Sequence, residues 1–264
     1  MRQEEVKPIV GDRVLCELLT PDTGVLTEIL PRRNFLERPL VANVDQVLVM
    51  GAAAQPTPNL VLIDRLLVTA EYLGLLAIVG INKADLAASA TGQALQQLYQ
   101  GIGYPAFFFS LQAADGLAAL KQHLAGHVTV LAGQSGVGKS SLLNALSTRQ
   151  VAETGDISQR GGAGRHTTKH VELLPLPETI SGFMVDTPGF SRLQLPEGLP
   201  AAELNHYFPE MRQHSDCRFG NSCVHLQEPD CGVKAALAAG LIAQSRYDSY
   251  QQLYAELWEN ERRY

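Results

Sequence analysis

The chain has 264 residues, more than the roughly 100 to 200 of a typical domain, so its length predicts two or three domains. An apolar fraction of 45% supports an ordinary buried core, and the net charge of −6 argues against a protein coated with basic residues for nucleic-acid binding. The first residues contain no hydrophobic signal segment, and no apolar run is long and charge-free enough to span a bilayer, so we expect a cytoplasmic protein without membrane contact.

Lysine and arginine nevertheless gather at two places, each of which predicts either a local basic patch or a solvated loop. One group lies near the start, and the other lies in the glycine-rich segment "GDISQRGGAGRHTTKH", which we interpret as a loop. The members are Arg32, Arg33 and Arg38 in the first group, and Arg160, Arg165 and Lys169, with His166 and His170, in the second.

Residues 1–40 have the pattern of a small β-rich piece. The runs "GDRVLCELL" and "GVLTEIL" are strand-like and are separated by the turn residues of "TPDTG". From residue 41 to 196 the pattern changes to apolar strands that alternate with amphipathic helices, expected near 58–73, near 90–100 and after Lys139. Such alternation predicts an α/β domain with a mostly parallel sheet covered by helices on both faces.

Residues 197–264 form the third predicted unit, which contains a cysteine cluster and then a helix over "YDSYQQLYAELWENERRY". Tyrosines, leucines and the sole Trp258 follow one another at helical spacing, a stripe that favours packing over a binding face.

The segment "GQSGVGKSS", residues 133–141, matches the phosphate-binding pattern G-x-x-x-x-G-K-[ST] at Gly133, Gly138, Lys139 and Ser140. It follows the apolar run "VTVLA" and precedes the helical "SSLLNAL", which is the context that the pattern requires. Glycines let backbone amides converge on phosphate oxygens, Lys139 reaches the terminal phosphates, and Ser140 can ligate Mg²⁺.

The segment "INKADL", residues 81–86, has the chemistry of a guanine-reading loop. The Asp85 carboxylate can accept hydrogen bonds from both the ring N–H and the exocyclic amine of guanine, a pair of donors that adenine lacks on that edge. The loop follows the apolar run "LLAIVGI" directly, and another strand ends at Ser110, where a backbone amide could meet the guanine carbonyl oxygen.

Downstream of the phosphate loop, "FMVDTPGF" places Asp186 at the end of a strand, where it would hold Mg²⁺ through water, and Gly189 where its amide would sense the γ-phosphate. Thr167 and Thr168 are candidates to close over Mg²⁺ and the γ-phosphate.

The guanine loop precedes the phosphate loop, the reverse of the usual GTPase order, so either the NKAD match is accidental or the domain is circularly permuted. Five elements in the right cyclic order favour permutation.

Permutation makes the Asp186 switch lead within a few residues into the cysteine segment, which predicts that nucleotide state is passed to residues 197–264.

The catalytic set lacks a glutamine directly after D-x-x-G, because Phe190 stands there and the next Gln is Gln194. Intrinsic turnover should then be slow and depend on a partner or on another side chain. His166 is the candidate to position water, with contact to RNA or solvent as the alternative.

Cys217, Cys223, His225 and Cys231 fall as C-x5-C-x-H-x5-C, a spacing that supplies three thiolates and an imidazole. That set satisfies tetrahedral Zn²⁺, and in a reducing compartment it favours a closed structural metal site over disulfides or free thiols.

These motifs together resemble a known family, the small ribosomal subunit biogenesis GTPases called RsgA (YjeQ). The resemblance covers nearly the whole chain and is carried by "GDRV", "ANVDQVLVM", "NKADL", "GQSGVGKSSLLNAL", "GRHTTKH", "DTPGF", "FPEM" and "CRFGNSCVHLQEPDCGV". It implies an OB-fold at residues 1–40, a permuted GTPase domain at 41–196 and an α-helical zinc domain at 197–264. It further implies guanine contacts at Asn82, Lys83, Ala84 and Asp85, phosphate contacts at Gly133, Gln134, Ser135, Gly136, Val137, Gly138, Lys139, Ser140 and Ser141, and zinc ligands at Cys217, Cys223, His225 and Cys231.

Two departures from the family pattern give further expectations. The chain starts ten residues before Gly11, so the five-stranded barrel should lack its first strands and have open edges. Lys169 stands where the family commonly has the third threonine of its switch loop, which adds positive charge.

The resemblance implies a GTPase that binds the 30S subunit late in maturation and hydrolyses GTP faster there. Its partners would be GTP or GDP, Mg²⁺ and 16S rRNA, and it would hold one structural Zn²⁺. We expect a monomer. One alternative is a nucleotide-gated RNA-binding module with negligible turnover. Another is an ATP-dependent, kinase-like P-loop enzyme, which requires the NKAD match to be accidental.

Overall fold

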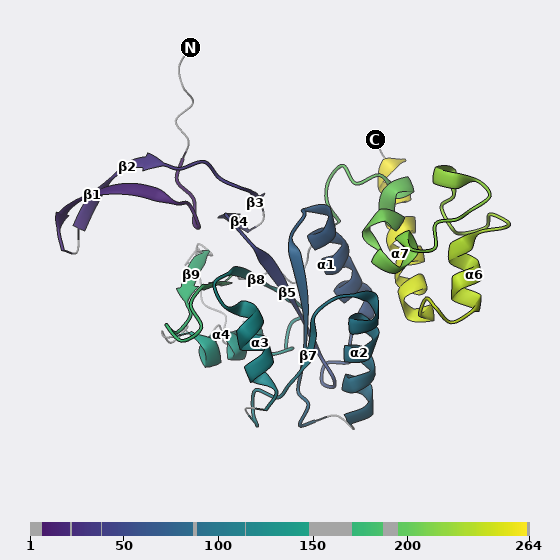
Figure 1. Cartoon of the computed structure of the whole chain (residues 1–264), viewed down its shortest axis with the longest axis horizontal. Coiled ribbons are helices and arrows are strands. Elements are labelled where there is room, and N and C mark those ends of the chain that lie inside the picture. Colours follow the sequence, from purple (N-terminus) through teal and green to yellow (C-terminus); the bar gives the residue numbers. More distant parts are fainter. Residues whose placement is uncertain are drawn as a thin grey trace, which may run out of the picture.

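The computed structural model of the chain describes residues 7–21, 23–37, 39–86, 89–113, 115–147, 171–186 and 195–262. A six-stranded sheet lies at its centre in the order β7-β6-β5-β8-β10-β9 (Figure 1). Neighbouring strands are parallel except for β9 with β10, which confirms the predicted mostly parallel sheet. The strands are β5 (Gln46–Ala52), β6 (Leu76–Asn82), β7 (Ala106–Phe108), β8 (Val128–Gly133), β9 (Glu172–Pro175) and β10 (Phe183–Asp186).

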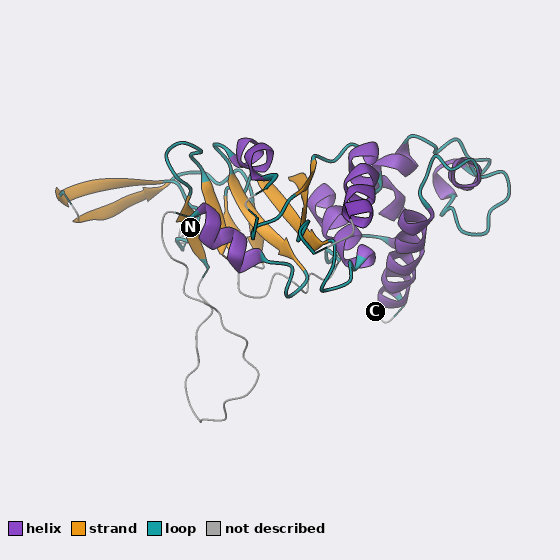
Figure 2. Cartoon of the chain, turned by 90° about the horizontal axis from the view of Figure 1, so that it is seen from below, coloured by secondary structure: helices purple, strands orange, loops and turns teal. Residues whose placement is uncertain are grey.

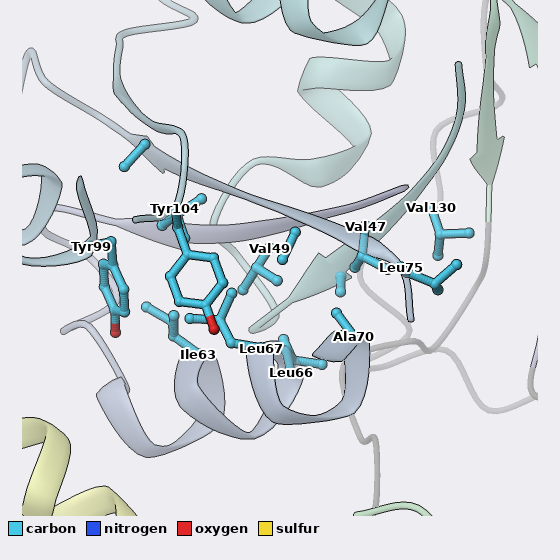
Figure 3. Close-up of a cluster of buried hydrophobic side chains, with 14 of the residues drawn as sticks. Val47, Val49, Ile63, Leu66, Leu67, Ala70, Leu75, Tyr99, Tyr104 and Val130 are labelled. Carbon is cyan, nitrogen blue, oxygen red and sulfur yellow. The ribbon is translucent and has the colours of Figure 1, made fainter. Parts of the chain in front are cut away.

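Helices cover both faces of this sheet, as the alternating pattern predicted (Figure 2). On one face, α1 (Leu60–Tyr72) and α2 (Ser89–Ile102) pack against the sheet, and Figure 3 shows Ile63, Leu66 and Leu67 of α1 beneath Val47 and Val49 of β5. On the other face lie α3 (Leu117–Leu124) and α4 (Lys139–Leu146). Because both of its faces are covered, every residue of β5 is buried, and β5 therefore reads as an apolar run without alternation.

The N-terminal strands form two antiparallel pairs, β1 (Val14–Thr20) with β2 (Thr23–Ile29), and β3 (Phe35–Glu37) with β4 (Leu40–Ala42). Within the described residues they do not close into a barrel, and the β1–β2 ribbon extends away from the sheet with both strands exposed (Figures 1 and 2). The β3–β4 pair, in contrast, is attached to the sheet domain, because Leu36 and Val41 join the core under α1.

Two arginines of the first basic group are engaged in ion pairs. Arg32 Nε lies 2.7 Å from Asp12 Oδ1, and Arg33 Nη2 lies 2.7 Å from Asp45 Oδ1. The Arg32 pair lies within the N-terminal part, and the Arg33 pair reaches the residue before β5. Both arginines therefore have a structural partner, a role that neither the basic-patch nor the solvated-loop interpretation described. Arg38 and the second basic group lie outside the described residues.

The C-terminal part is helical and packs beside α1 (Figure 1). The predicted C-terminal helix is α7 (Gln244–Glu261), and its stripe packs as expected at Tyr247 and Tyr250, whereas Trp258 remains 49% exposed. None of the helices in the described part of the chain is long and apolar enough to cross a membrane. The remaining elements are the 3₁₀-helices η1 (Ala201–Tyr207) and η2 (Gly220–Ser222) and the helices α5 (Pro209–Arg212) and α6 (Gly232–Ala238).

Candidate functional site

The candidate phosphate loop begins where β8 ends, at the point where the chain order of the sheet reverses. Strands β5, β6 and β7 follow one another outward, and β8 then returns to the other side of β5, with Gly133 opposite Met50. In open α/β sheets, ligands bind at the carboxyl ends of strands beside such a reversal. The topology therefore places residues 133–141 where a bound nucleotide is expected.

Two glycines of this loop have backbone conformations and surroundings that exclude a side chain. Gly133 has φ +141, and a Cβ there would lie 2.2 Å from the Met50 carbonyl oxygen. Gly138 has φ +102, and its Cβ would lie 2.4 Å from Asn82 Nδ2. Gly138 is also the N-cap of α4 and makes no side-chain capping bond, so the first amides of α4 remain available to an anion.

Lys139, the first residue of α4, folds its side chain back over the loop. Its Nζ donates hydrogen bonds of 2.8 Å to the carbonyl oxygens of Gly133 and Gln134, and burial lowers the pKa of its ammonium group. The ammonium is thus held inside the loop by neutral carbonyls, and a phosphate oxygen would offer it a charged acceptor. Ser140 and Ser141 follow on the exposed side of α4.

Asn82, the last residue of β6, ties the guanine loop to two other loops. Its Nδ2 donates to the Val137 carbonyl oxygen over 2.9 Å, and its Oδ1 accepts from the Leu111 amide over 3.2 Å. The side chain is almost fully buried, so these bonds form away from competing water. One amide side chain therefore joins the phosphate loop, the guanine loop and the loop after β7.

The Asp85 carboxylate is exposed and is held from one side by Ser110. The Ser110 hydroxyl donates to Asp85 Oδ1 over 2.5 Å and accepts from the Ala113 amide over 3.0 Å. The Ser110 amide itself donates to the Asp115 carbonyl oxygen over 3.1 Å. The contact of a backbone amide near Ser110 with guanine stays a prediction. In the described structure Ser110 acts on Asp85 through its hydroxyl group.

Sequence reasoning did not identify the segment between β5 and α1 as part of this edge of the sheet. Lys83, which has φ +66, donates from Nζ to the Gln55 carbonyl oxygen, and Pro56 lies beside Gly136. The only sequence signal was the proline-rich "AAQPTPN" directly after a buried strand, which marks a turn but not its contacts.

Several predicted site residues cannot be placed against these loops. His166, Thr167, Thr168 and Gly189 lie outside the described residues. Asp186 is described by its backbone alone: it ends β10, whose neighbour β8 runs parallel to it and ends in the phosphate loop. The position of Asp186 at the end of β10 is the one predicted from the sequence.

The second candidate site is a cluster of three cysteines and one histidine in the C-terminal part. The ligand atoms of Cys217, Cys223, His225 and Cys231 all lie within 4.8 Å of one another. Cys217 Sγ lies 3.7 Å from Cys231 Sγ, and His225 Nδ1 lies 3.3 Å from Cys231 Sγ. Tetrahedral coordination with metal–sulfur bonds of about 2.3 Å puts ligand atoms about 3.8 Å apart, so the donor set fits such an ion.

Burial shapes the protonation of this cluster. It raises the pKa of the Cys223 thiol to about 12 and also raises that of Cys231, while it lowers the pKa of His225. A metal ion must therefore displace thiol protons, whereas the imidazole is already neutral and offers Nδ1. Hydrogen bonds hold the surrounding chain: Tyr247 donates to the His225 carbonyl oxygen over 2.6 Å, and Glu228 accepts from the amides of Val224, Leu226 and Gln227.

Comparison with known proteins decides the family of this chain. The profile of the RsgA GTPase family matches residues 29–196. The chain belongs to the RsgA GTPase family. Two relatives, from Alkaliphilus metalliredigens and Moorella thermoacetica, are each named small ribosomal subunit biogenesis GTPase RsgA and are 44% identical over 99% of this chain and 89% of their own length.

Solved structures agree with this membership. The crystal structure of YloQ, titled a circularly permuted GTPase, superposes with a TM-score of 0.79 at 38% identity, over 98% of this chain and 84% of that one. YjeQ from Thermotoga maritima gives a TM-score of 0.78 at 38% identity, over 97% and 86%. The permuted GTPase fold predicted from motif order is thus confirmed, and membership of the family makes the chain a GTP hydrolase.

Proposed function

We propose that this RsgA-family GTPase acts in the biogenesis of the small ribosomal subunit, where it hydrolyses GTP to GDP and phosphate and is stimulated by the 30S particle through contact with 16S rRNA. The names of its relatives support this function. The observation that carries the GTPase part is the meeting of the phosphate, guanine and Ser110 loops at one sheet edge through Asn82.

The proposed roles follow from the donors and acceptors at that edge. Asn82 positions the loops, Lys83 and Ala84 form the wall of the base site, and Asp85, oriented by Ser110, accepts the two donors of guanine. Backbone amides from Gly133 to Ser141 and the Lys139 ammonium hold the phosphates.

For the metal and the catalytic step, we propose Ser140 and Asp186 as the Mg²⁺ positions. When bound, Mg²⁺ neutralises charge on the phosphate oxygens. Thr167 or Thr168 would close over the γ-phosphate, the Gly189 amide would sense it, and His166 would position the attacking water.

In the C-terminal part we propose one structural Zn²⁺ held by Cys217, Cys223, Cys231 and His225 Nδ1. Zinc suits a closed set of thiolates and imidazole, and the burial of three of the four residues leaves little room for a substrate ligand. We further propose domains at 1–40, 41–196 and 197–264, the first related to an OB-fold, and a monomer that acts in the cytoplasm.

The test is GTP hydrolysis by the zinc-loaded protein with and without purified 30S subunits. Phosphate release should rise strongly with 30S subunits, ATP should not compete, and Lys139→Ala should abolish the signal. If GTP binds tightly but 30S subunits leave hydrolysis unchanged, the ribosomal part of the proposal fails. Equal competition by ATP would overturn the guanine-reading role of Asp85.

A further inference from the structure

Helix α1 has two packed faces, and the second one contacts the C-terminal part. Ile63, Leu66 and Leu67 pack on the sheet, whereas Val68 belongs to the core of the C-terminal part. Within the described residues, three charged side chains of α1 form ion pairs with the C-terminal part. These pairs are Asp64 with Arg246, Arg65 with Glu256, and Glu71 with Arg212.

The pair of Asp64 with Arg246 is fully buried, and each of its two side chains has a further hydrogen-bond partner. Arg246 of α7 donates from Nη1 to Asp64 Oδ1 over 2.6 Å and from Nε to Glu210 Oε1 over 2.7 Å. The side chains of Arg246 and Asp64 are each 1% exposed, and the guanidinium lies 4.5 Å from the centre of the Phe208 ring. A buried charge set of this kind is costly to form and costly to break at one member, so its arrangement is tightly determined.

Asp64 also accepts a hydrogen bond from the GTPase side. The Tyr99 hydroxyl of α2 donates to Asp64 Oδ1 over 2.9 Å. The same carboxylate oxygen therefore accepts hydrogen bonds from α2 and, through Arg246, from α7. Glu210, Arg246, Asp64 and Tyr99 therefore form one continuous chain of hydrogen bonds. It runs from α5 and α7 of the C-terminal part through α1 to α2.

The two GTPase-domain helices that this hydrogen-bonded network joins, α1 and α2, are both connected to the guanine loop. Helix α2 is the first element after Asp85, and α1 is capped by Asn59 at the end of the segment whose Gln55 carbonyl oxygen accepts from Lys83. The Ala53 amide, at the start of that segment, donates to the Asn82 carbonyl oxygen over 2.9 Å. Asp64 lies one helical turn beyond the start of α1, whereas Tyr99 lies in the last turn of α2. The hydrogen-bonded network therefore joins two helices that each lead away from the base site, near the start of α1 and near the end of α2.

We propose that the Glu210–Arg246–Asp64–Tyr99 network couples occupancy of the guanine site to docking of the C-terminal part, independently of the γ-phosphate. Glu210 and Arg246 are positioning residues that act through α1 and α2. Ordering of the base site by nucleotide is less costly when both helices are already fixed by the network, so nucleotide affinity and C-terminal order strengthen each other. The proposal rests on the proposed nucleotide site, and it differs from a switch route through Asp186, which requires the γ-phosphate.

The test uses the full-length, zinc-loaded protein with GDP, which has no γ-phosphate. Glu210→Gln keeps the shape of the side chain and removes its charge, and among the described residues the Glu210 carboxylate bonds to Arg246 and not to the phosphate or guanine loop. We expect GDP affinity to fall at least 5-fold, the lower end of typical coupling between sites. In the wild-type protein, GDP should slow amide exchange in α7, and this effect should shrink in the variant. Glu203→Gln, the same change at an exposed position in η1, should leave both readouts unchanged.

Tyr99→Phe tests the network from the other end, because it removes one hydroxyl at nearly constant volume and should also lower GDP affinity at least 5-fold. The two variants combined should lose less than the product of their separate effects, since they interrupt one chain. A merely structural network would lower the melting temperature while leaving GDP affinity within 2-fold of wild type, and that result overturns the proposal. If the wild-type protein fails to bind GDP, the proposed nucleotide site itself is wrong.

Discussion

The guanine–phosphate edge of the sheet and the cysteine cluster of the C-terminal part are organised in opposite ways. At the sheet edge the polar side chains already have protein partners: Asn82 bridges three loops, Ser110 holds Asp85, and Lys139 is bonded to two carbonyls. In the cluster, burial raises the pKa values of the Cys223 and Cys231 thiols, and the four donor atoms lie within 4.8 Å of one another. The first site is assembled before its ligand, whereas the second needs its ligand to hold together.

The largest expected effect follows from loss of the metal. Cys231→Ser removes one of four donors, and structural zinc contributes on the order of 10 kcal/mol to the folding of small domains, so residues 197–262 should lose protection in hydrogen exchange. The six-stranded sheet, with its own core on both faces, should keep its protection. Cys16→Ser, at an exposed position on β1, is the matched control and should retain one metal ion per chain. A Cys231→Ser protein with full metal content and unchanged exchange would contradict the comparison.

A second prediction concerns the sheet edge, where the limit is steric. Gly138→Ala places a Cβ 2.4 Å from Asn82 Nδ2 at a φ of +102, so either the loop or the Asn82 bridge must move. Strain of about 2 to 3 kcal/mol corresponds to a GTP affinity about 30- to 150-fold lower, measured by titration calorimetry. Gly101→Ala serves as the control, because nothing lies within 4 Å of its Cβ in helix α2, and Ala should slightly stabilise that helix. An unchanged affinity for Gly138→Ala would show that the loop adapts and is not preassembled.

The local parts of both candidate sites could be predicted from the sequence because each is encoded by short spacing. The phosphate loop, the guanine loop and the four cysteine and histidine ligands are read from residues a few positions apart, and parallel strand order then brings the loops to one edge. The contacts between α1 and α7 were not predicted, since Asp64 and Arg246 are far apart in sequence and each reads as an ordinary charged helix residue. The exposed state of β1 was also invisible, because "VLCELLT" has the residues of a buried strand and only its neighbours decide burial.

A third prediction tests how much the Ser110 hydroxyl contributes to the preassembled edge. Ser110→Ala leaves Asp85 in place but removes the group that donates to Oδ1 and accepts from the Ala113 amide. One or two hydrogen bonds are worth about 1 to 1.5 kcal/mol, so GDP affinity should fall about 5- to 10-fold. Ser215→Ala, which removes an exposed hydroxyl bonded to the Arg212 carbonyl oxygen, is the control. Full retention of GDP affinity would mean that Asp85 needs no orientation.

The smallest effect is expected at a partly exposed ion pair between α1 and α7. Arg65 and Glu256 face each other in a bidentate arrangement, but their side chains are 18% and 35% exposed, so water and salt screen the attraction. A double-mutant cycle of Arg65→Gln and Glu256→Gln should give a coupling of about 0.5 to 1 kcal/mol in thermal unfolding of the zinc-loaded protein, and high salt should reduce it further. The buried Arg246 contacts the same helix face, and truncating one member of a buried pair costs about 3 to 5 kcal/mol. A coupling as large as that for Arg65 and Glu256 would mean that this pair, rather than the buried pair at Asp64, carries the contact between α1 and α7.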